Sequence, residues 1–228
     1  MAPPPFSPTV LGRWKQFEFQ MITDPSQYPS VLEHLHNNFF RSTPLTQGLD
    51  YSKEYFDEFD KIYLTTLPQN LSFAAVDVET NEIAGLRITY VQDKELERTF
   101  EYLGFETPQM KIMQKIMGTV NHNSKIYETY GIDSFVNFYT ACVDPKYRGQ
   151  GLASEMYNQA LAFVRQRKDF HYVKSNLTSP YTRKICHKFG FTELARVYYN
   201  DFRDENGIPL LNGATDDEFV AFMCLKLR

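Results

Sequence analysis

The sequence VDPKYRGQGLAS, residues 143–154, joins an apolar run directly to a helical pattern through a turn that contains Gly149 and Gly151. A turn of this kind points several backbone N–H groups at one spot, and the helix dipole adds partial positive charge there. The glycines carry no side chain that would block a close approach, and Arg148 can add a charged contact. The stretch therefore predicts a site for a phosphate or diphosphate. A tight connection with ordinary glycines is the alternative, and two glycines alone do not exclude it.

Strands and helices are expected on both sides of this turn. Apolar runs predict seven strands, at residues 17–21, 71–79, 83–92, 135–143, 171–174, 191–199 and 218–227. Apolar residues at helical spacing predict helices over 25–39, 51–67, 110–120, 151–167 and 180–188. This mixed order predicts an α/β or α+β fold, in which helices cover a sheet.

The composition is that of a globular protein, because 43% of the 228 residues are apolar and 23% are charged. A net charge of -4 and the lack of a basic stripe disfavour a nucleic-acid partner. We expect one domain over residues 13–228, present as a monomer or weak dimer. Residues 1–12, with four prolines, predict a loose lead-in that is neither a signal peptide nor a membrane span.

The three cysteines, Cys142, Cys186 and Cys224, lie far apart in the sequence and are odd in number. They favour free thiols in a reducing compartment, and we expect a cytoplasmic protein. No cysteine or histidine spacing matches a metal site, so no metal is expected.

Two segments resemble the GNAT superfamily of N-acetyltransferases. RGQGLA at residues 148–153 is similar to the superfamily's coenzyme A signature, Arg/Gln-x-x-Gly-x-Gly/Ala, and YTRKICHKFGF at residues 181–191 is similar to its second conserved helix. The resemblance implies the GNAT fold, a central mixed, mostly antiparallel twisted sheet of about seven strands flanked by helices. It also implies that acetyl-CoA is the co-substrate and lies in a gap where the sheet splays beside strand 135–143. The coenzyme-binding residues that it implies are Ala141, Cys142, Val143, Arg148, Gly149, Gln150, Gly151, Leu152, Ala153 and Ser154.

The N-terminal half is most similar to the invertebrate arylalkylamine N-acetyltransferases. The similarity rests on FFRSTPL at residues 39–45, which corresponds to their Phe-Phe-x-x-Glu-Pro-Leu segment. This implies that a small primary amine, an arylalkylamine or a polyamine-like compound, attacks the thioester directly. The family glutamate is replaced by Thr43, which cannot accept a proton at neutral pH.

Other positions where relatives carry acid–base residues also differ. Vertebrate relatives use two histidines on the motif strand, and Asn137 and Tyr139 take their places here. Many GNAT enzymes have a tyrosine general acid where this chain has Cys186. A thiol can donate a proton to the leaving thiolate, and a small buried core residue is the alternative.

Three further polar side chains are candidates for the catalytic site. Ser179 and Thr182 could position water or the leaving sulfur, with a helix cap and a solvated helix face as the alternatives. Tyr139 could contact the substrate or bind a water, with core packing as the alternative.

An acidic group, Asp50, Glu54, Asp57 and Glu58, lies near the start of the second helix. It could attract a cationic amine, and a solvated acidic helix face is the alternative.

The sequence leaves two main functions open. One is an amine acetyltransferase that deprotonates its substrate through water or an unidentified residue, and the other is a coenzyme A-binding relative with weak or no amine acetylation because of Thr43. A protein-lysine or N-terminal acetyltransferase is a third.

Overall fold

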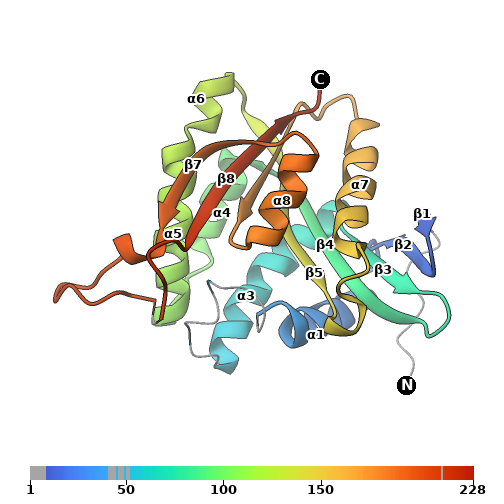
Figure 1. The fold of residues 1–228 in the computed structure, drawn as a ribbon, viewed down its shortest axis with the longest axis horizontal. Helices are drawn as coiled ribbons and strands as arrows, with labels where there is room; N and C mark the ends of the chain where they lie inside the picture. The colour runs from blue at the N-terminus through green and yellow to red at the C-terminus, as the bar shows by residue number, and fades with distance from the viewer. Residues whose placement is uncertain (1–8, 41–44, 46–48, 50–51, 212) are drawn as a thin grey trace.

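A sheet of eight strands forms the centre of the protein (Figure 1). The computed structural model describes residues 9–40, 45, 49, 52–211 and 213–228. The strands are β1 (Val10–Trp14), β2 (Phe17–Met21), β3 (Phe73–Asp77), β4 (Glu82–Asp93), β5 (Ser134–Val143), β6 (Tyr172–Leu177), β7 (Thr192–Tyr198) and β8 (Phe219–Lys226). They lie in the order β1-β2-β3-β4-β5-β6-β8-β7, and every neighbouring pair is antiparallel except β5 with β6. The predicted mixed, mostly antiparallel sheet is confirmed.

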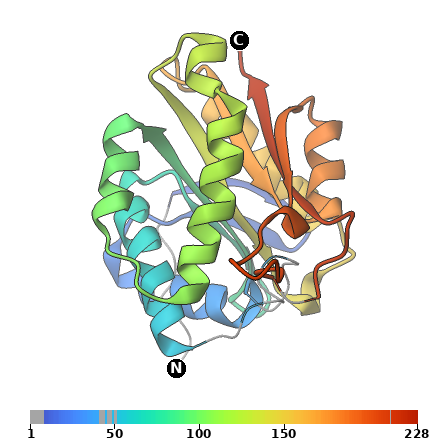
Figure 2. The ribbon, with the colours of Figure 1, turned by 90° about the vertical axis from the view of Figure 1, so that its left-hand side faces the viewer.

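Helices cover both faces of the sheet (Figure 2). The helices are α1 (Tyr28–Asn38), α3 (Lys53–Thr66), α4 (Lys94–Tyr102), α5 (Pro108–Ser124), α6 (Ile126–Tyr130), α7 (Leu152–Arg165) and α8 (Pro180–Lys188). Buried side chains of α1, α3, α5 and α6 join one hydrophobic cluster, and those of α7 and α8 join a second. We call the first side the α3/α5 face and the second the α7/α8 face.

The parallel junction between β5 and β6 is short. The strands pair only at Val136 with Val173 and at Asn137 with Lys174, although both continue further. The Ser175 hydroxyl donates to the Phe138 carbonyl at 2.7 Å just beyond the last pair. The strands then separate, which leaves a gap in the sheet between the rest of β5 and the end of β6.

A β-bulge changes the direction of the side chains at this gap. Ile88 of β4 pairs with Thr140 and Thr89 pairs with Phe138, so Tyr139 is the extra residue of β5. Phe138 packs on the α7/α8 face, whereas the rings of Tyr139 and Tyr63 lie 5.9 Å apart on the α3/α5 face. A bulge can redirect side chains next to a functional site, and here it turns Tyr139 toward α3.

The structure departs from the predicted elements in two places. Strand β1 begins at Val10, inside the stretch predicted to be a loose lead-in, and adds an eighth strand at the sheet edge. The segment 93–131 contains three helices rather than one, because α4 and α6 flank α5. On α5, Met110 and Met113 are buried in the core as the methionine pattern predicted.

Candidate active site

A cavity of about 1410 Å³ lies where β5 and β6 separate. It is lined from both faces of the sheet. On the α7/α8 face it includes the turn before α7, and on the α3/α5 face it reaches α3, α4 and α5. The cavity therefore connects the predicted phosphate site with a chamber on the opposite face of the sheet.

The turn before α7 has the backbone geometry that a phosphate site needs. Gly149 and Gly151 both have positive φ, +76° and +89°, a region that side chains other than hydrogen disfavour. Gly151 is the N-cap of α7, and no side chain caps the first N–H groups of this 14-residue helix. These N–H groups and the helix dipole are thus directed at the cavity mouth.

The β1–β2 hairpin holds this turn from outside. The Lys15 ammonium donates to the Gln150 carbonyl at 2.9 Å, and a Cβ atom on Gly151 would lie 3.6 Å from the Trp14 ring. Contacts from a strand that is more than 100 residues away in the sequence therefore fix the conformation of the turn.

Most of the predicted coenzyme-binding residues line the cavity. They are Ala141, Cys142, Val143, Arg148, Gly149, Gly151, Leu152, Ala153 and Ser154. Gln150 is outside the lining, and its side chain and carbonyl face Gln16 and Lys15 of the hairpin. The Arg148 guanidinium donates to the Val143 carbonyl at 3.0 Å, which ties the end of β5 to the turn.

The predicted catalytic candidates divide into two groups. Tyr139, Ser179 and Thr182 line the cavity. Ser179 also caps α8, since its hydroxyl accepts from the Tyr181 N–H, and Thr182 donates to the Ser179 carbonyl. Cys186 is fully buried and outside the lining, and burial raises the pKa of its thiol to about 11.

The acidic side chains that reach the cavity differ from those proposed from sequence. Glu58 is buried and accepts hydrogen bonds from Glu106 and Thr107, so it anchors the start of α5 rather than facing the cavity. Glu54 and Asp57 are exposed and also lie outside the lining. Asp50 lies outside the described residues. Among the described residues, the carboxylates that line the chamber are those of Glu97, Glu101 and Glu128.

A polar network on the α3/α5 face lies at the closed end of the gap. Asn137 donates to the Tyr90 hydroxyl at 2.9 Å and to the Gln92 amide oxygen at 2.8 Å. Its own Oδ1 is buried without a hydrogen-bond partner among the described residues. A ligand N–H group would satisfy this oxygen, since buried acceptors are rarely left unpaired.

Lys174 lies beside Asn137 in the parallel pairing and also lines the cavity. Its ammonium group lies 5.3 Å from the centre of the Phe222 ring, and the residue is only 3% exposed. Burial lowers the pKa of Lys174 to about 7. The side chain can therefore exist as a neutral amine near neutral pH, which makes it a proton acceptor that the sequence analysis missed.

The family model for the acetyltransferase (GNAT) family matches residues 32–191, which is more than half of the chain. The chain belongs to the acetyltransferase (GNAT) family. The matched residues contain β5, the turn, α7, β6 and α8, so all the lining residues of the cavity except Phe222 lie within the GNAT segment.

Solved structures of insect enzymes share the whole fold. Arylalkylamine N-acetyltransferase 2 from Aedes aegypti is 22% identical, with a TM-score of 0.82 over 94% of this chain and 100% of that chain. A mosquito arylalkylamine N-acetyltransferase like 5b is 17% identical, with a TM-score of 0.79 over 92% of this chain and 99% of that chain. Polyamine N-acetyltransferase from Drosophila melanogaster is 18% identical, with a TM-score of 0.74 over 91% of this chain and 99% of that chain. These similarities show that the chain has the fold of these enzymes.

Thr43 and Asn137 occupy two positions at which the sequence comparison expected acid–base residues. Thr43, at the place of the family glutamate, lies outside the described residues. Asn137, at the place of a vertebrate histidine, is one of the buried polar groups in the network above. The proton acceptor is therefore sought among the other groups that line the cavity, which include His122 and Lys174, and burial lowers the pKa of Lys174 to about 7.

The described residues contain neither a metal-binding cluster nor a helix that could span a membrane. Among the described residues, no group of three or more His, Cys, Asp or Glu side chains could hold a metal ion. No described helix has both the length and the apolar character to cross a membrane.

Proposed function

We propose that this protein transfers the acetyl group of acetyl-CoA to the primary amine of a small molecule, an arylalkylamine or a polyamine-like compound. The observation that carries this proposal is the cavity between β5 and β6. It joins a turn suited to a diphosphate on one face of the sheet to a chamber with aromatic and carboxylate side chains on the other. The two substrates would meet in the gap, where the amine nitrogen attacks the thioester carbonyl directly.

The coenzyme side fits a long phosphorylated thioester. The uncapped N–H groups of α7 and the turn from Arg148 to Ser154 would hold the diphosphate. Beyond Asn137, the edge of β5 no longer pairs with β6, so its backbone groups are open to the pantetheine arm and the thioester carbonyl. A backbone N–H group directed at that carbonyl would stabilise the charge that develops on its oxygen.

The amine side fits an organic cation with an apolar body. Aromatic rings on this side of the cavity belong to Phe39, Phe59, Phe100, Phe105, Tyr90, Tyr127 and Tyr139. Among them lies Glu97, whose Oε1 accepts from Gln92 and from the Tyr127 hydroxyl. The rings suit an aryl group or alkyl chain, and the carboxylates favour a cation.

Lys174 is the proposed proton acceptor. An alkylammonium has no lone pair, so it must lose a proton before or during attack. Neutral Lys174 would take this proton directly or through a water, while the Asn137 Oδ1 accepts a hydrogen bond from the amine. A group with a pKa of about 7 is matched to this task near neutral pH.

A coenzyme A-binding relative without amine chemistry is the less favoured alternative. This alternative rested on the replacement of the family glutamate by Thr43, which removes a proton acceptor. It is less favoured because Lys174 supplies another group that can accept the proton.

The three cysteines are free and buried, which supports our proposal of a cytoplasmic protein. We also propose that the single domain acts as a monomer or weak dimer.

Thiol release from acetyl-CoA tests the proposed function. The protein is incubated with acetyl-CoA and, in separate reactions, an arylethylamine, a polyamine and a free amino acid, and free thiol is followed with time. We expect release to accelerate with the arylethylamine or the polyamine and to stay at the spontaneous rate with the amino acid. Measurable coenzyme A binding without acceleration by any amine would favour the alternative.

A further inference from the structure

Arg87 of β4 is a buried guanidinium that has no acceptor. The residue is fully buried, and its Nε, Nη1 and Nη2 atoms have no hydrogen-bond partner among the described residues. Its guanidinium carbon lies 4.0 Å from the centre of the Phe138 ring and 4.2 Å from that of Tyr157. Contacts with two rings and the nearby Tyr157 hydroxyl offset part of the cost of burying a charge, but no described acceptor meets its N–H donors at hydrogen-bond geometry.

No described side chain serves as its counter-ion. Two titratable groups face the guanidinium, Tyr157 from α7 and Cys186 from α8. Burial raises the pKa of Tyr157 to about 12 and that of Cys186 to about 11, so both are neutral in the physiological range. Lys174, the other buried cation at the gap, packs against Phe222 in the cluster on the α3/α5 face.

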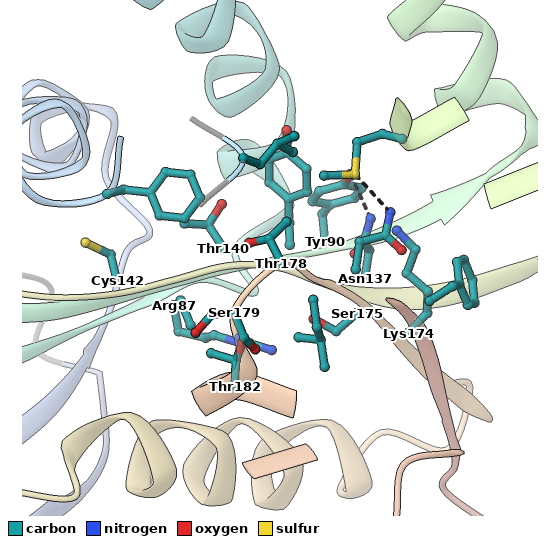
Figure 3. A pocket seen from close by; sticks show the side chains of 18 of the residues that line it. Arg87, Tyr90, Asn137, Thr140, Cys142, Lys174, Ser175, Thr178, Ser179 and Thr182 are labelled. Carbon is teal, nitrogen blue, oxygen red and sulfur yellow. Dashed lines mark hydrogen bonds between the residues drawn. The ribbon is translucent and has the colours of Figure 1, made fainter. Parts of the chain in front are cut away.

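Arg87 lines the cavity on the side where the coenzyme is expected. Figure 3 shows it with Ser179 and Thr182, on the side of β5 that faces α7 and α8. Tyr90 and Thr140 lie on the opposite side of the strand (Figure 3). An acceptor for Arg87 would therefore come from the coenzyme rather than from the amine.

The distance along β5 between the phosphate turn and the Arg87 guanidinium indicates which part of the coenzyme would reach Arg87. Arg87 pairs with Ala141, and its guanidinium contacts the ring of Phe138, which lies five residue steps along β5 from Val143 at the phosphate turn. This is roughly 16 Å of extended chain, a length that the pantetheine arm can cover. The group that reaches Arg87 is then the sulfur end of the coenzyme.

We propose that Arg87 binds the coenzyme sulfur and stabilises it as the thiolate. This inference rests on the proposed function. In the transfer, the C–N bond forms as the C–S bond breaks, the electron pair of the C–S bond stays on sulfur, and the amine proton passes to Lys174 or water. Arg87 keeps its own proton and supplies the positive charge. It thereby takes over the stabilisation that a proton donor at position 186 would give.

The test measures the pKa of the coenzyme thiol in the bound state. Ultraviolet absorbance of the thiolate is followed with pH for the coenzyme A complex, and the desulfo-coenzyme A complex is subtracted to remove the protein's own thiols and phenols. A free thiol titrates near pH 8.5. In the wild-type complex we expect the pKa to be lower by about one unit or more, so that coenzyme A gains about sixfold or more over desulfo-coenzyme A in affinity between pH 7 and pH 9.

Three variants assign the effect to this side chain. Arg87→Met should return the bound thiol to the pKa of free coenzyme A or above it, and Arg87→Lys should keep part of the shift because it keeps the charge. Arg203→Gln, an exposed arginine that donates to the Gly207 carbonyl, is the matched control and should behave as wild type. Arg87→Met should also melt at or above the wild-type temperature without coenzyme, because an unpaired buried charge is removed.

The outcomes separate this inference from the function on which it rests. Coenzyme A that binds wild-type protein with an unshifted or raised thiol pKa would overturn the role of Arg87, even if no variant folds. If Arg87→Met weakened the binding of succinyl-CoA but left the binding of coenzyme A unchanged, the proposed role of Arg87 would also be overturned. The anion that Arg87 binds would then be a carboxylate of the acyl group and not the sulfur. Failure of wild-type protein to bind coenzyme A would instead contradict the proposed function.

Discussion

At the scale of single residues, Lys174 has an environment that few lysines in proteins share. It lies on β6 inside the sheet, 3% exposed, between the network around Asn137 and the ring of Phe222. Burial disfavours the ammonium form and lowers the pKa of Lys174 to about 7. Perturbed lysines of this kind, when they line a cavity, are often functional.

We expect Lys174→Met to lower amine-dependent turnover by about 100-fold or more, the usual effect of losing a general base. Only the neutral lysine accepts a proton, so wild-type kcat should rise as the pH increases through about 7. This rise should be absent in the variant. The exposed Lys168→Met is the matched control. A pH profile of kcat that keeps its rise near pH 7 in Lys174→Met would show that another group accepts the proton.

The sequence predicted some site residues and missed others for physical reasons. The glycines and Arg148 were found because phosphate binding needs a local turn, and a local turn leaves a local pattern. Arg87 and Lys174 were missed because each stands alone in a strand, where a charged residue is normally taken to face solvent. Arg87 is covered by the rings of Phe138 and Tyr157 and Lys174 lies against Phe222, so their burial is a property of the assembled fold.

At the scale of elements, α5 forms a wall of the chamber on the α3/α5 face, and Glu58 of α3 fixes its start. The Glu58 carboxylate accepts from the backbone N–H groups of Glu106 and Thr107 and from the Thr107 hydroxyl. Thr107 in turn is the N-cap of α5. The acidic residue proposed from sequence as an attraction for the amine is thus a structural link between two helices.

We expect Glu58→Ala to lower the free energy of unfolding by about 2–3 kcal/mol, because it removes hydrogen bonds to a charged acceptor and leaves buried donors unpaired. The amine KM should also increase, since α5 carries side chains that line the chamber. Urea denaturation and steady-state kinetics measure both effects. Asp57→Ala, which removes an exposed pair with Lys53, should cost less than about 1 kcal/mol. Equal costs for the two variants would contradict the anchoring role.

The elements themselves were largely predictable. All seven predicted strands are present, because buried alternation marks them in the sequence. Strand β1 was not predicted because it is a half-exposed edge strand without a clear alternation of apolar residues. Helices α4 and α6 were missed because α4 buries no residue and α6 has only five residues.

At the scale of the whole molecule, one local feature of the sheet explains why its two faces contribute different groups to the same cavity. The parallel junction of β5 and β6 is limited to two pairs, and the cavity opens where the pairing stops. The α7/α8 face then offers the phosphate turn and Arg87, and the α3/α5 face offers Lys174, Asn137 and the aromatic chamber. Each substrate can approach from its own side and react inside the sheet.

Coenzyme A binding measured by titration calorimetry, in wild type and in Gly151→Glu, tests this arrangement most directly. We expect the variant to lose measurable binding, a drop of about 100-fold or more, because bulk and negative charge would then stand at the diphosphate. Gly207→Glu, another glycine with positive φ and open surroundings, controls for backbone strain and should bind as wild type does. Unchanged affinity for coenzyme A in a folded Gly151→Glu protein would contradict the placement of the coenzyme at this turn.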